Sequence, residues 1–298
     1  MAIMRGLRLL PVVLTVTAAL LTAPVAGGSE DQQILVMKID NSKAARPQTG
    51  IAAADLMYVE PVEGGLSRLM AVYWTNTPQV VGPVRSARES DINLLQQFGR
   101  PALGFSGGAP EVLNALGQAD ISLVNKVAGG YVRHGDRPAP HNLYADPAKL
   151  LQAADANSHP PALARGSVRP DGVSTASFDT KVAATPITVT WDDTRSRWMI
   201  AMDGAPLLDT AGGQASAGTV IVQQVRITDS AVHDVAGVPS PIADTTGGGK
   251  ATVLRDRMRF DGNWTWNADR RITEFSTDDR EPIPLAESGP VWILLAKA

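Results

Sequence analysis

Between Glu60 and Arg88 the chain reads EPVEGGLSRLMAVYWTNTPQVVGPVRSAR. The apolar run in its middle, residues 66–74, predicts one β-strand, because apolar and polar side chains partly alternate along it. Turn-forming residues lie at both ends of this strand, Gly64-Gly65 before it and Gly82-Pro83 after it. Carboxylates and arginines gather at the same turns, and loops at strand ends often carry functional residues. The stretch therefore predicts a strand of a buried sheet with a functional site beside it.

Outward from this stretch, short apolar runs alternate with helix signals. Strands are predicted at residues 34–39, 56–60 and 102–106, and helices at residues 51–55, 90–98, 109–116 and 146–156. Strands that alternate with helices favour a mixed α/β (α+β) fold in which helices cover a sheet. We therefore expect a layered α/β sandwich as an N-terminal domain over residues 34–156.

The composition changes after residue 156. The stretch 157–176 is rich in Pro, Gly, Ser and Arg, so residues 157–180 are predicted to be a linker. Short strands separated by turns follow, at residues 187–191, 197–202, 218–225, 250–255, 257–260, 262–266 and 291–295. This pattern predicts a mainly antiparallel β C-terminal domain over residues 181–298.

The N-terminal residues 1–28 have the pattern of a targeting segment. Arg5 and Arg8 precede an apolar run from Leu9 to Ala23, and small residues follow it. This is the layout of a signal peptide. An uncleaved membrane anchor is the alternative, although the run is shorter than the roughly 20 apolar residues that a membrane span needs. In either case we expect the rest of the chain to be exported, as a secreted or extracytoplasmic protein.

The overall composition narrows the classes of function. The chain has 298 residues, of which 44% are hydrophobic, so it can bury a sizeable core. Its net charge is −3, which argues against a nucleic-acid surface and against a polybasic membrane patch. Any membrane contact is expected only through residues 1–28, if they are not cleaved. The chain has no cysteine and four histidines, so we expect no disulfide, no metal site rich in these residues and no cofactor.

Two carboxylates, Glu60 and Glu63, lie three residues apart at the start of the stretch. Paired carboxylates perform acid/base chemistry when their surroundings separate their pKa values, and they also ligate hard cations. A turn in which they pair with arginines explains the same residues without any function. Both interpretations stay open; we take Glu63 as a catalytic candidate and Glu60 as a ligand-binding candidate.

Three arginines, Arg68, Arg85 and Arg88, follow the carboxylates. The last two are three residues apart and directly precede a predicted helix, where guanidinium groups and free helix N–H groups can hold a phosphate or carboxylate. Ordinary surface arginine is the alternative, since arginine side chains are mostly exposed. We predict that all three arginines bind an anionic group.

The histidine with the most suggestive neighbours is His141, in Pro140-His141-Asn142-Leu143-Tyr144. Histidine is the usual general acid or base near neutral pH. A structural histidine bonded to a backbone carbonyl is the alternative. We take His141 as a second catalytic candidate, and Asn142 and Tyr144 as ligand-binding candidates on the opposite wall of a cleft.

Several motifs can be compared as a set: Asp40-Asn41, Ala45-Arg46-Pro47-Gln48-Thr49-Gly50, Ala54-Asp55, Pro61-Val62-Glu63-Gly64-Gly65, Gly82-Pro83-Val84-Arg85-Ser86-Ala87-Arg88 and Ala139-Pro140-His141-Asn142-Leu143-Tyr144 in the first half, and Trp191-Asp192, Val220-Ile221-Val222, Gly247-Gly248-Gly249-Lys250 and Gly262-Asn263-Trp264 in the second. This set resembles the YerB-like family of bacterial exported proteins, a domain-of-unknown-function family. The resemblance implies two domains and export, and it implies no reaction. It suggests lipoproteins among the relatives, but this chain has no cysteine to lipidate.

These observations lead to two functional hypotheses. The first is a protein of the cell envelope that binds an anionic small molecule, a glycan or an envelope protein through a cleft in the N-terminal domain. The second is a hydrolase acting on such a ligand, with Glu63 or His141 as general acid/base. The sequence contains no complete catalytic constellation, so binding is the preferred hypothesis.

Overall fold

The computed structural model describes residues 33–298 except 168, 170, 235 and 236. The predicted signal or anchor segment, residues 1–28, lies outside these residues. Helices are few in the described part: α1 (Ser90–Leu95), α2 (Pro110–Gln118) and α3 (Pro147–Ala153), with short 3-10 turns η1 (Lys43–Ala45), η2 (Ile51–Ala53), η3 (Glu63–Gly65) and η4 (Gln96–Phe98). None of the described helices is long and apolar enough to cross a membrane.

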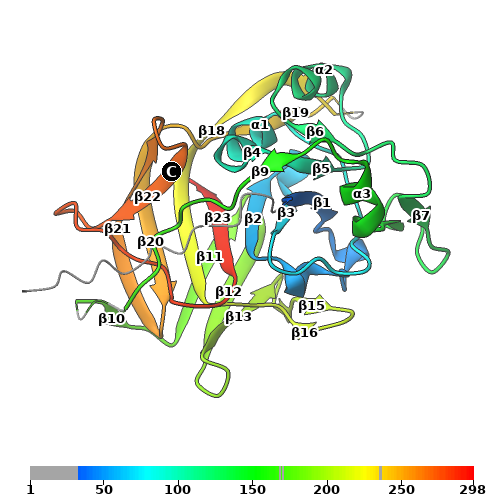
Figure 1. The fold of residues 1–298 in the computed structure, drawn as a ribbon. Helices are drawn as coiled ribbons and strands as arrows, with labels where there is room; N and C mark the ends of the chain where they lie inside the picture. The colour runs from blue at the N-terminus through cyan, green and yellow to red at the C-terminus, as the bar shows by residue number, and fades with distance from the viewer. Residues whose placement is uncertain (1–32, 168, 170, 235–236) are drawn as a thin grey trace, which may run out of the picture.

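One large sheet runs through most of the molecule (Figure 1). Its strands lie in the order β10 (Val173–Ser174), β21 (Met258–Asn267), β20 (Gly248–Arg255), β18 (Thr219–His233), β23 (Val291–Lys297), β2 (Leu56–Pro61), β3 (Ser67–Tyr73), β1 (Leu35–Asp40), β5 (Ala102–Gly104) and β6 (Ser122–Leu123). Two further strands extend it: β19 (Pro239–Asp244) pairs with β18, and β22 (Ile272–Ser276) pairs with β21.

The sheet is mixed, and strand β23 joins its two halves. It pairs in parallel with β18 on one side and with β2 on the other. The pairs β1–β5 and β5–β6 are also parallel, whereas β1–β3, β2–β3, β18–β20 and β20–β21 are antiparallel. Backbone hydrogen bonds therefore run without interruption from the first half of the chain to the second.

A second sheet lies beside the large one. It contains β11 (Ser177–Val182), β12 (Thr185–Asp192), β13 (Arg197–Met202), β14 (Ala205–Pro206) and β17 (Ser216–Ala217). Small two-stranded pairs complete the structure: β15 (Leu208–Asp209) with β16 (Gly213–Gln214), β4 (Gly99–Arg100) with β9 (Asn157–Ser158), and β7 (Tyr131–Arg133) with β8 (Leu143–Ala145).

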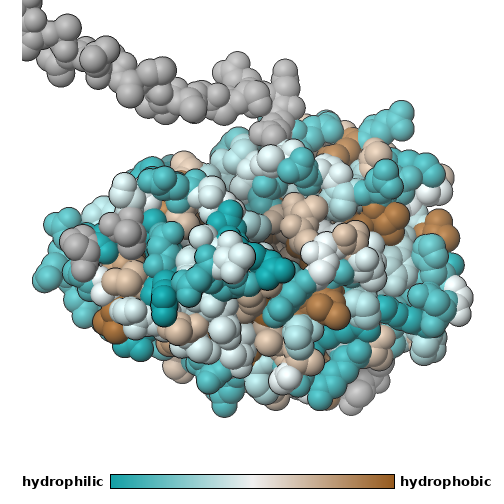
Figure 2. Space-filling view, turned by 90° about the horizontal axis from the view of Figure 1, so that it is seen from below, coloured by the Kyte–Doolittle hydropathy of each residue, from teal (hydrophilic) through white to brown (hydrophobic). Residues whose placement is uncertain are grey.

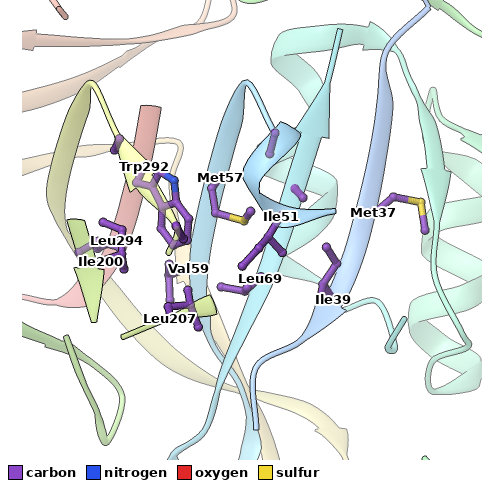
Figure 3. Close-up of a cluster of buried hydrophobic side chains, with 14 of the residues drawn as sticks. Met37, Ile39, Ile51, Met57, Val59, Leu69, Ile200, Leu207, Trp292 and Leu294 are labelled. Carbon is purple, nitrogen blue, oxygen red and sulfur yellow. The ribbon is translucent and has the colours of Figure 1, made fainter. Parts of the chain in front are cut away.

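The central strands are buried on both faces, because alternate residues of each strand enter two different hydrophobic clusters. In β1, Met37 and Ile39 belong to the cluster shown in Figure 3, together with Trp292 and with Ile200 of the second sheet. Val36 of the same strand belongs to the other cluster, which contains residues of α1 and α2. This explains why the sequence of β1, LVMKID, has no clear alternation.

The outer surface carries its hydrophobic residues in separate places. On the face shown in Figure 2, hydrophobic side chains form small patches among hydrophilic ones. Exposed large apolar residues occur singly along the described chain, with Leu66 48% and Val132 56% exposed. Surfaces of this kind are normal for a soluble domain, so the face in Figure 2 offers no large apolar docking surface.

The predicted strands and helices differ from the observed ones in several places, and strands β19 and β22 of the large sheet are not among the predicted ones. The stretch predicted as a linker, residues 157–180, contains β9, β10 and the first part of β11. Strand β18 continues to His233, well past the predicted end at residue 225. The prediction ended too early because the second half of the strand is only partly buried and gives a weak apolar signal. That second half pairs with β19, and the two lie beside α1 (Figure 1). The predicted helix 146–156 ends at Ala153.

Candidate functional site

A cleft of about 570 Å³ lies at the ends of the central strands, and we call it the arginine cleft. Four parts of the chain line it: the turn between β2 and β3, residues 85–88, the start of α2, and the adjoining ends of β18 and β19. Both halves of the sequence therefore contribute to its walls. It includes four of the residues predicted from sequence, Glu63, Arg68, Arg85 and Arg88.

The change from apolar to charged residues along the strands creates this cleft. Arg68 of β3 is in register with Glu60 of β2 on one side and with Asp40 of β1 on the other. Residues in register on neighbouring strands share a face of the sheet. Further along the same face the residues are apolar, for example Val36 and Val72. Charged side chains thus replace the core at one end of the three strands.

The turn between β2 and β3 depends on two glycines. Gly64 and Gly65 have φ values of 66° and 73°, in the left-handed region that glycine adopts without strain. They let the chain reverse within η3, so that Glu63 lines the cleft directly beyond the end of β2. Leu66, the residue after the turn, is 48% exposed at the edge of the cleft.

Arg68 is the most unusual side chain of the cleft. It is only 4% exposed, and its Nε and Nη1 atoms have no hydrogen-bond partner among the described residues. Burial lowers its pKa to about 10, and the nearby charges of Arg85 and Arg88 act in the same direction, whereas Asp40 and Glu63 oppose the change. The guanidinium group is still positive at neutral pH. Burying a cation whose N–H donors have no acceptor costs free energy, unless an anion pairs with it.

Glu63 and Arg88 form a matched pair. Arg88 Nε donates to Glu63 Oε1 at 2.7 Å and Nη2 donates to Oε2 at 2.6 Å, a two-point contact between the two planar groups. The hydroxyl of Ser240, from β19, also donates to Glu63. Burial alone would raise the pKa of Glu63, but the hydrogen bonds from Arg88 and Ser240 and the charge of Arg88 lower it instead. Glu63 is therefore a carboxylate at neutral pH.

Asp40 connects Arg85 with His141. The segment 83–85 runs along the end of β1, where Arg85 N donates to Lys38 O at 2.9 Å. This brings Arg85 Nε to 3.2 Å from Asp40 Oδ2, and His141 Nδ1 lies 2.8 Å from the same oxygen. Burial would raise the pKa of Asp40, but the charge of Arg68, the Ser42 N–H, the hydrogen bond from His141 and the charge of Arg85 together lower it.

A second charged group lies beneath the cleft and is fully buried. Lys38 Nζ donates to Glu60 and, at 2.6 Å, to Asp91 Oδ1. Asp91 Oδ2 accepts the backbone N–H of Arg88 at 2.8 Å, which ties this buried group to the cleft wall. Burial and the neighbouring Asp91 raise the pKa of Glu60 to about 8, although Lys38 acts in the opposite direction. Glu60 therefore holds a proton at neutral pH.

The structure does not bring all the predicted residues together. Glu60 is 1% exposed and contacts Lys38 rather than the cleft. His141 reaches the cleft only through Asp40 and Arg85. Asn142 bonds Arg133 and the carbonyl of His134, while Tyr144 packs edge-on against the His134 ring at 4.8 Å. Residues 140–144 are thus not among the lining residues; the wall expected there comes from α2, β18 and β19.

The sequence-based selection left out several charged and polar residues of this region: Asp40, Lys38, Asp91 and Ser240. Asp40 directly follows the predicted strand at residues 34–39 and belongs to the Asp40-Asn41 motif, so the sequence offers a reason to include it among the candidate site residues. Ser240 bonds Glu63 across 177 positions of sequence, and nothing local in the sequence indicates that contact.

The described residues of the cleft provide few free ligands for a metal ion. Glu63, which lines it, and Asp40, which lies next to Arg85, already accept hydrogen bonds from arginine or histidine. The described residues contain no group of three or more His, Asp or Glu side chains that could hold a metal. Two other clefts, of about 650 Å³ beside β22 and about 470 Å³ near Arg255, lack an unpartnered buried cation of this kind among the described residues that line them.

Comparison with known proteins places the chain in a family. The model of the "Protein of unknown function (DUF3048) N-terminal domain" matches residues 21–160, and that of the DUF3048 C-terminal domain matches residues 177–293. A protein of Bacillus subtilis (strain 168), named "Putative lipoprotein YerB", is 24% identical over 266 residues, and the match covers 83% of this chain and 79% of the relative.

The fold has a solved counterpart. The crystal structure of the YerB protein from Bacillus subtilis matches with a TM-score of 0.75 and 20% sequence identity, over 90% of this chain and 92% of that one. The resemblance noted in the sequence motifs is thereby confirmed. The first half of this chain matches the N-terminal domain of the DUF3048 family and the second half matches its C-terminal domain, so the chain belongs to that family.

Proposed function

We propose that this protein binds an anionic ligand in the arginine cleft. The observation that supports this most is Arg68, a buried guanidinium in a cleft large enough for a small molecule, whose Nε and Nη1 have no partner in the part of the chain that the structure describes. The start of α2 also faces the cleft, and a helix N-terminus adds partial positive charge. The described lining contains no tyrosine or tryptophan on which a sugar ring could stack, so an anionic ligand is favoured over a neutral glycan.

We further propose that the protein works outside the cytoplasm, in association with the cell envelope. The apolar run Leu9 to Ala23 after Arg5 and Arg8 supports export. The name of the Bacillus subtilis relative is in keeping with this location. Lipid attachment to a cysteine does not extend to this chain, which has none.

A thermal-stability screen tests the proposed binding. Acetate, sulfate and phosphate are each added at constant ionic strength, so that general screening by salt stays the same. A ligand at 100 times its dissociation constant stabilises the native state by about 2.7 kcal/mol, which raises the Tm. We expect at least one anion to raise the Tm of the wild type, and the increase to be reduced in Arg85→Ala and lost in Arg68→Gln.

Arg195→Ala is the matched control, because Arg195 is exposed and pairs with Asp192 in the hairpin between β12 and β13. It should respond to the anions as the wild type does. If none of the anions raises the wild-type Tm, or if the cleft variants respond as fully as Arg195→Ala, the proposed anion binding is wrong.

Hydrolysis of the bound ligand is a second candidate function, and the contact between His141 and Asp40 is the observation in its favour. Because Nδ1 faces the ionised Asp40, the other ring nitrogen, Nε2, is the one that can accept a proton from water. Glu63 does not suit the role of general acid, since its pKa is lowered and Arg88 holds both of its oxygens. Ser42 lies 3.2 Å from the same Nδ1 and so is not placed as a nucleophile activated by Nε2.

Mass spectrometry distinguishes binding from hydrolysis. Each compound that raises the Tm is incubated with the wild type and with His141→Gln. For a hydrolase we expect product only with the wild type, while both proteins still bind the compound. A compound that stays intact with the wild type counts against hydrolysis and leaves the binding function in place.

A further inference from the structure

Two of the three arginines that line the arginine cleft have a carboxylate partner. Arg88 is paired with Glu63 through two contacts, and Arg85 lies 3.2 Å from Asp40. Arg68, by contrast, has no ion pair within 4 Å among the described residues. The charge of Arg68 therefore has no direct counter-charge from the described residues, and one negative charge on a ligand would balance it.

A second negative charge on the ligand would be unfavourable at this place. Glu63 and Asp40 both have lowered pKa values and are ionised at neutral pH. Both carboxylates are buried and lie near Arg68, whose charge they influence. A dianion bound to Arg68 would bring its extra charge close to these two groups, and like charges repel strongly where water is excluded. The surroundings of Arg68 thus favour a ligand with a single charge.

The cleft also has an apolar side. Val62 and Val112 line it and are otherwise buried, 3% and 1% exposed, while Leu66 at its edge is 48% exposed. An aliphatic group bound there would cover Leu66 and remove apolar surface from water. These three residues come from the β2–β3 turn and from α2, which also border the place occupied by the arginines.

On these grounds, which rest on the proposed anion binding, we propose that the cleft takes a monocarboxylate that carries an aliphatic group. Its carboxylate pairs with the planar guanidinium of Arg68, which suits carboxylate geometry. Its aliphatic group lies against Val62, Val112 and Leu66. The compound is either a free branched-chain acid or the C-terminal carboxylate of a peptide with an aliphatic last residue, since both present the same chemistry.

Isothermal titration with matched small molecules tests the proposal. The probes are 4-methylpentanoate, N-acetylleucine, acetate, sulfate and the uncharged 4-methylpentanamide. We expect one or both of the aliphatic acids to bind at least about tenfold more tightly than acetate and sulfate, and the amide not to bind. Tighter binding of N-acetylleucine than of 4-methylpentanoate indicates a peptide end, and the reverse order indicates a free acid.

Two variants separate the contributions of charge and apolar surface. Arg68→Gln should abolish binding of every carboxylate. Leu66→Ser, at an exposed position where folding is little affected, should weaken the aliphatic acids severalfold and leave acetate unchanged. Sulfate binding that is tighter than that of both acids and depends on Arg68 would overturn the monocarboxylate proposal and keep the anion cleft. Absence of binding by all the anions would overturn both.

Discussion

Replacing Lys38 with methionine is expected to lower the free energy of unfolding by about 3–5 kcal/mol, the usual cost of removing one partner from a buried charged group. Lys38, Glu60 and Asp91 are at most 1% exposed, so no water can take over the role of the lost ammonium group. The variant would leave the Asp91 carboxylate and the Glu60 carboxyl group side by side in the interior without a cation. Urea unfolding measured by circular dichroism gives the difference directly.

The pH dependence of stability provides the control for this prediction. Because the pKa of Glu60 is raised from 4.5 to about 8 in the native state, the native protein holds a proton that the unfolded chain releases between these values. The contribution of this carboxyl to stability is complete below pH 4.5 and is lost as the pH rises through about 8. Glu60→Gln should remove this decline and should recover part of the stability lost in Lys38→Met.

Glu63 is expected to behave in the opposite way, although it lies only three residues from Glu60. Its pKa is lowered, so its contribution is present above pH 4.5 and is lost as the pH falls below that value. Glu63→Gln should therefore weaken the loss of stability in acid and leave the pH dependence of stability between pH 5 and 8 unchanged.

For the Lys38 prediction, a Lys38→Met variant as stable as the wild type at pH 7 would contradict the buried group of Lys38, Glu60 and Asp91 as described.

Replacing Arg68 with methionine is expected to separate stability from binding. Methionine keeps an unbranched apolar stem but removes a buried guanidinium whose Nε and Nη1 have no partner within the described structure. Replacement of poorly compensated buried charges by apolar residues is often neutral or stabilising. We therefore expect the free energy of unfolding in anion-free buffer to rise by about 1 kcal/mol, while the Tm increase caused by anions disappears.

The neighbouring Arg88→Met is the matched comparison. It leaves Glu63 without its two-point partner, and hydrogen bonds to charged groups are worth about 1.5–3 kcal/mol. Arg88→Met should therefore be less stable than the wild type, and Arg68→Met should not. If Arg68→Met is the less stable of the two in urea unfolding, Arg68 has a structural role and the argument for a ligand fails.

The sequence was informative where a feature is local. Turn residues and apolar runs located β2, β3 and the glycine turn between them, so the arginines and Glu63 were found near one place. It could not separate Glu60 from Glu63, because that depends on the strand ending between them: Glu60, still within β2, points into the interior, and Glu63 follows in the turn. Burial by other parts of the chain, which gives the two carboxyls opposite pKa changes, has no local signal.

Long-range pairing was the other limit. The run at residues 291–295 was recognised as a strand, but its apolar character says nothing about its neighbours. In the structure it lies between β18 and β2, strands from different halves of the sequence. The contact of Ser240 with Glu63 follows from the same arrangement, since β18 and β19 lie beside α1 and η3 only when the halves share a sheet.

The position of β23 has a consequence for how the two family domains can be inherited. Separation of the chain between residues 160 and 177 would leave β2 with a bare apolar edge on one fragment and β23 with a complementary bare edge on the other. Exposed edges of this kind recruit other strands and promote aggregation. We therefore expect neither family domain to occur without the other, although the family models place a clear boundary between the two in the sequence.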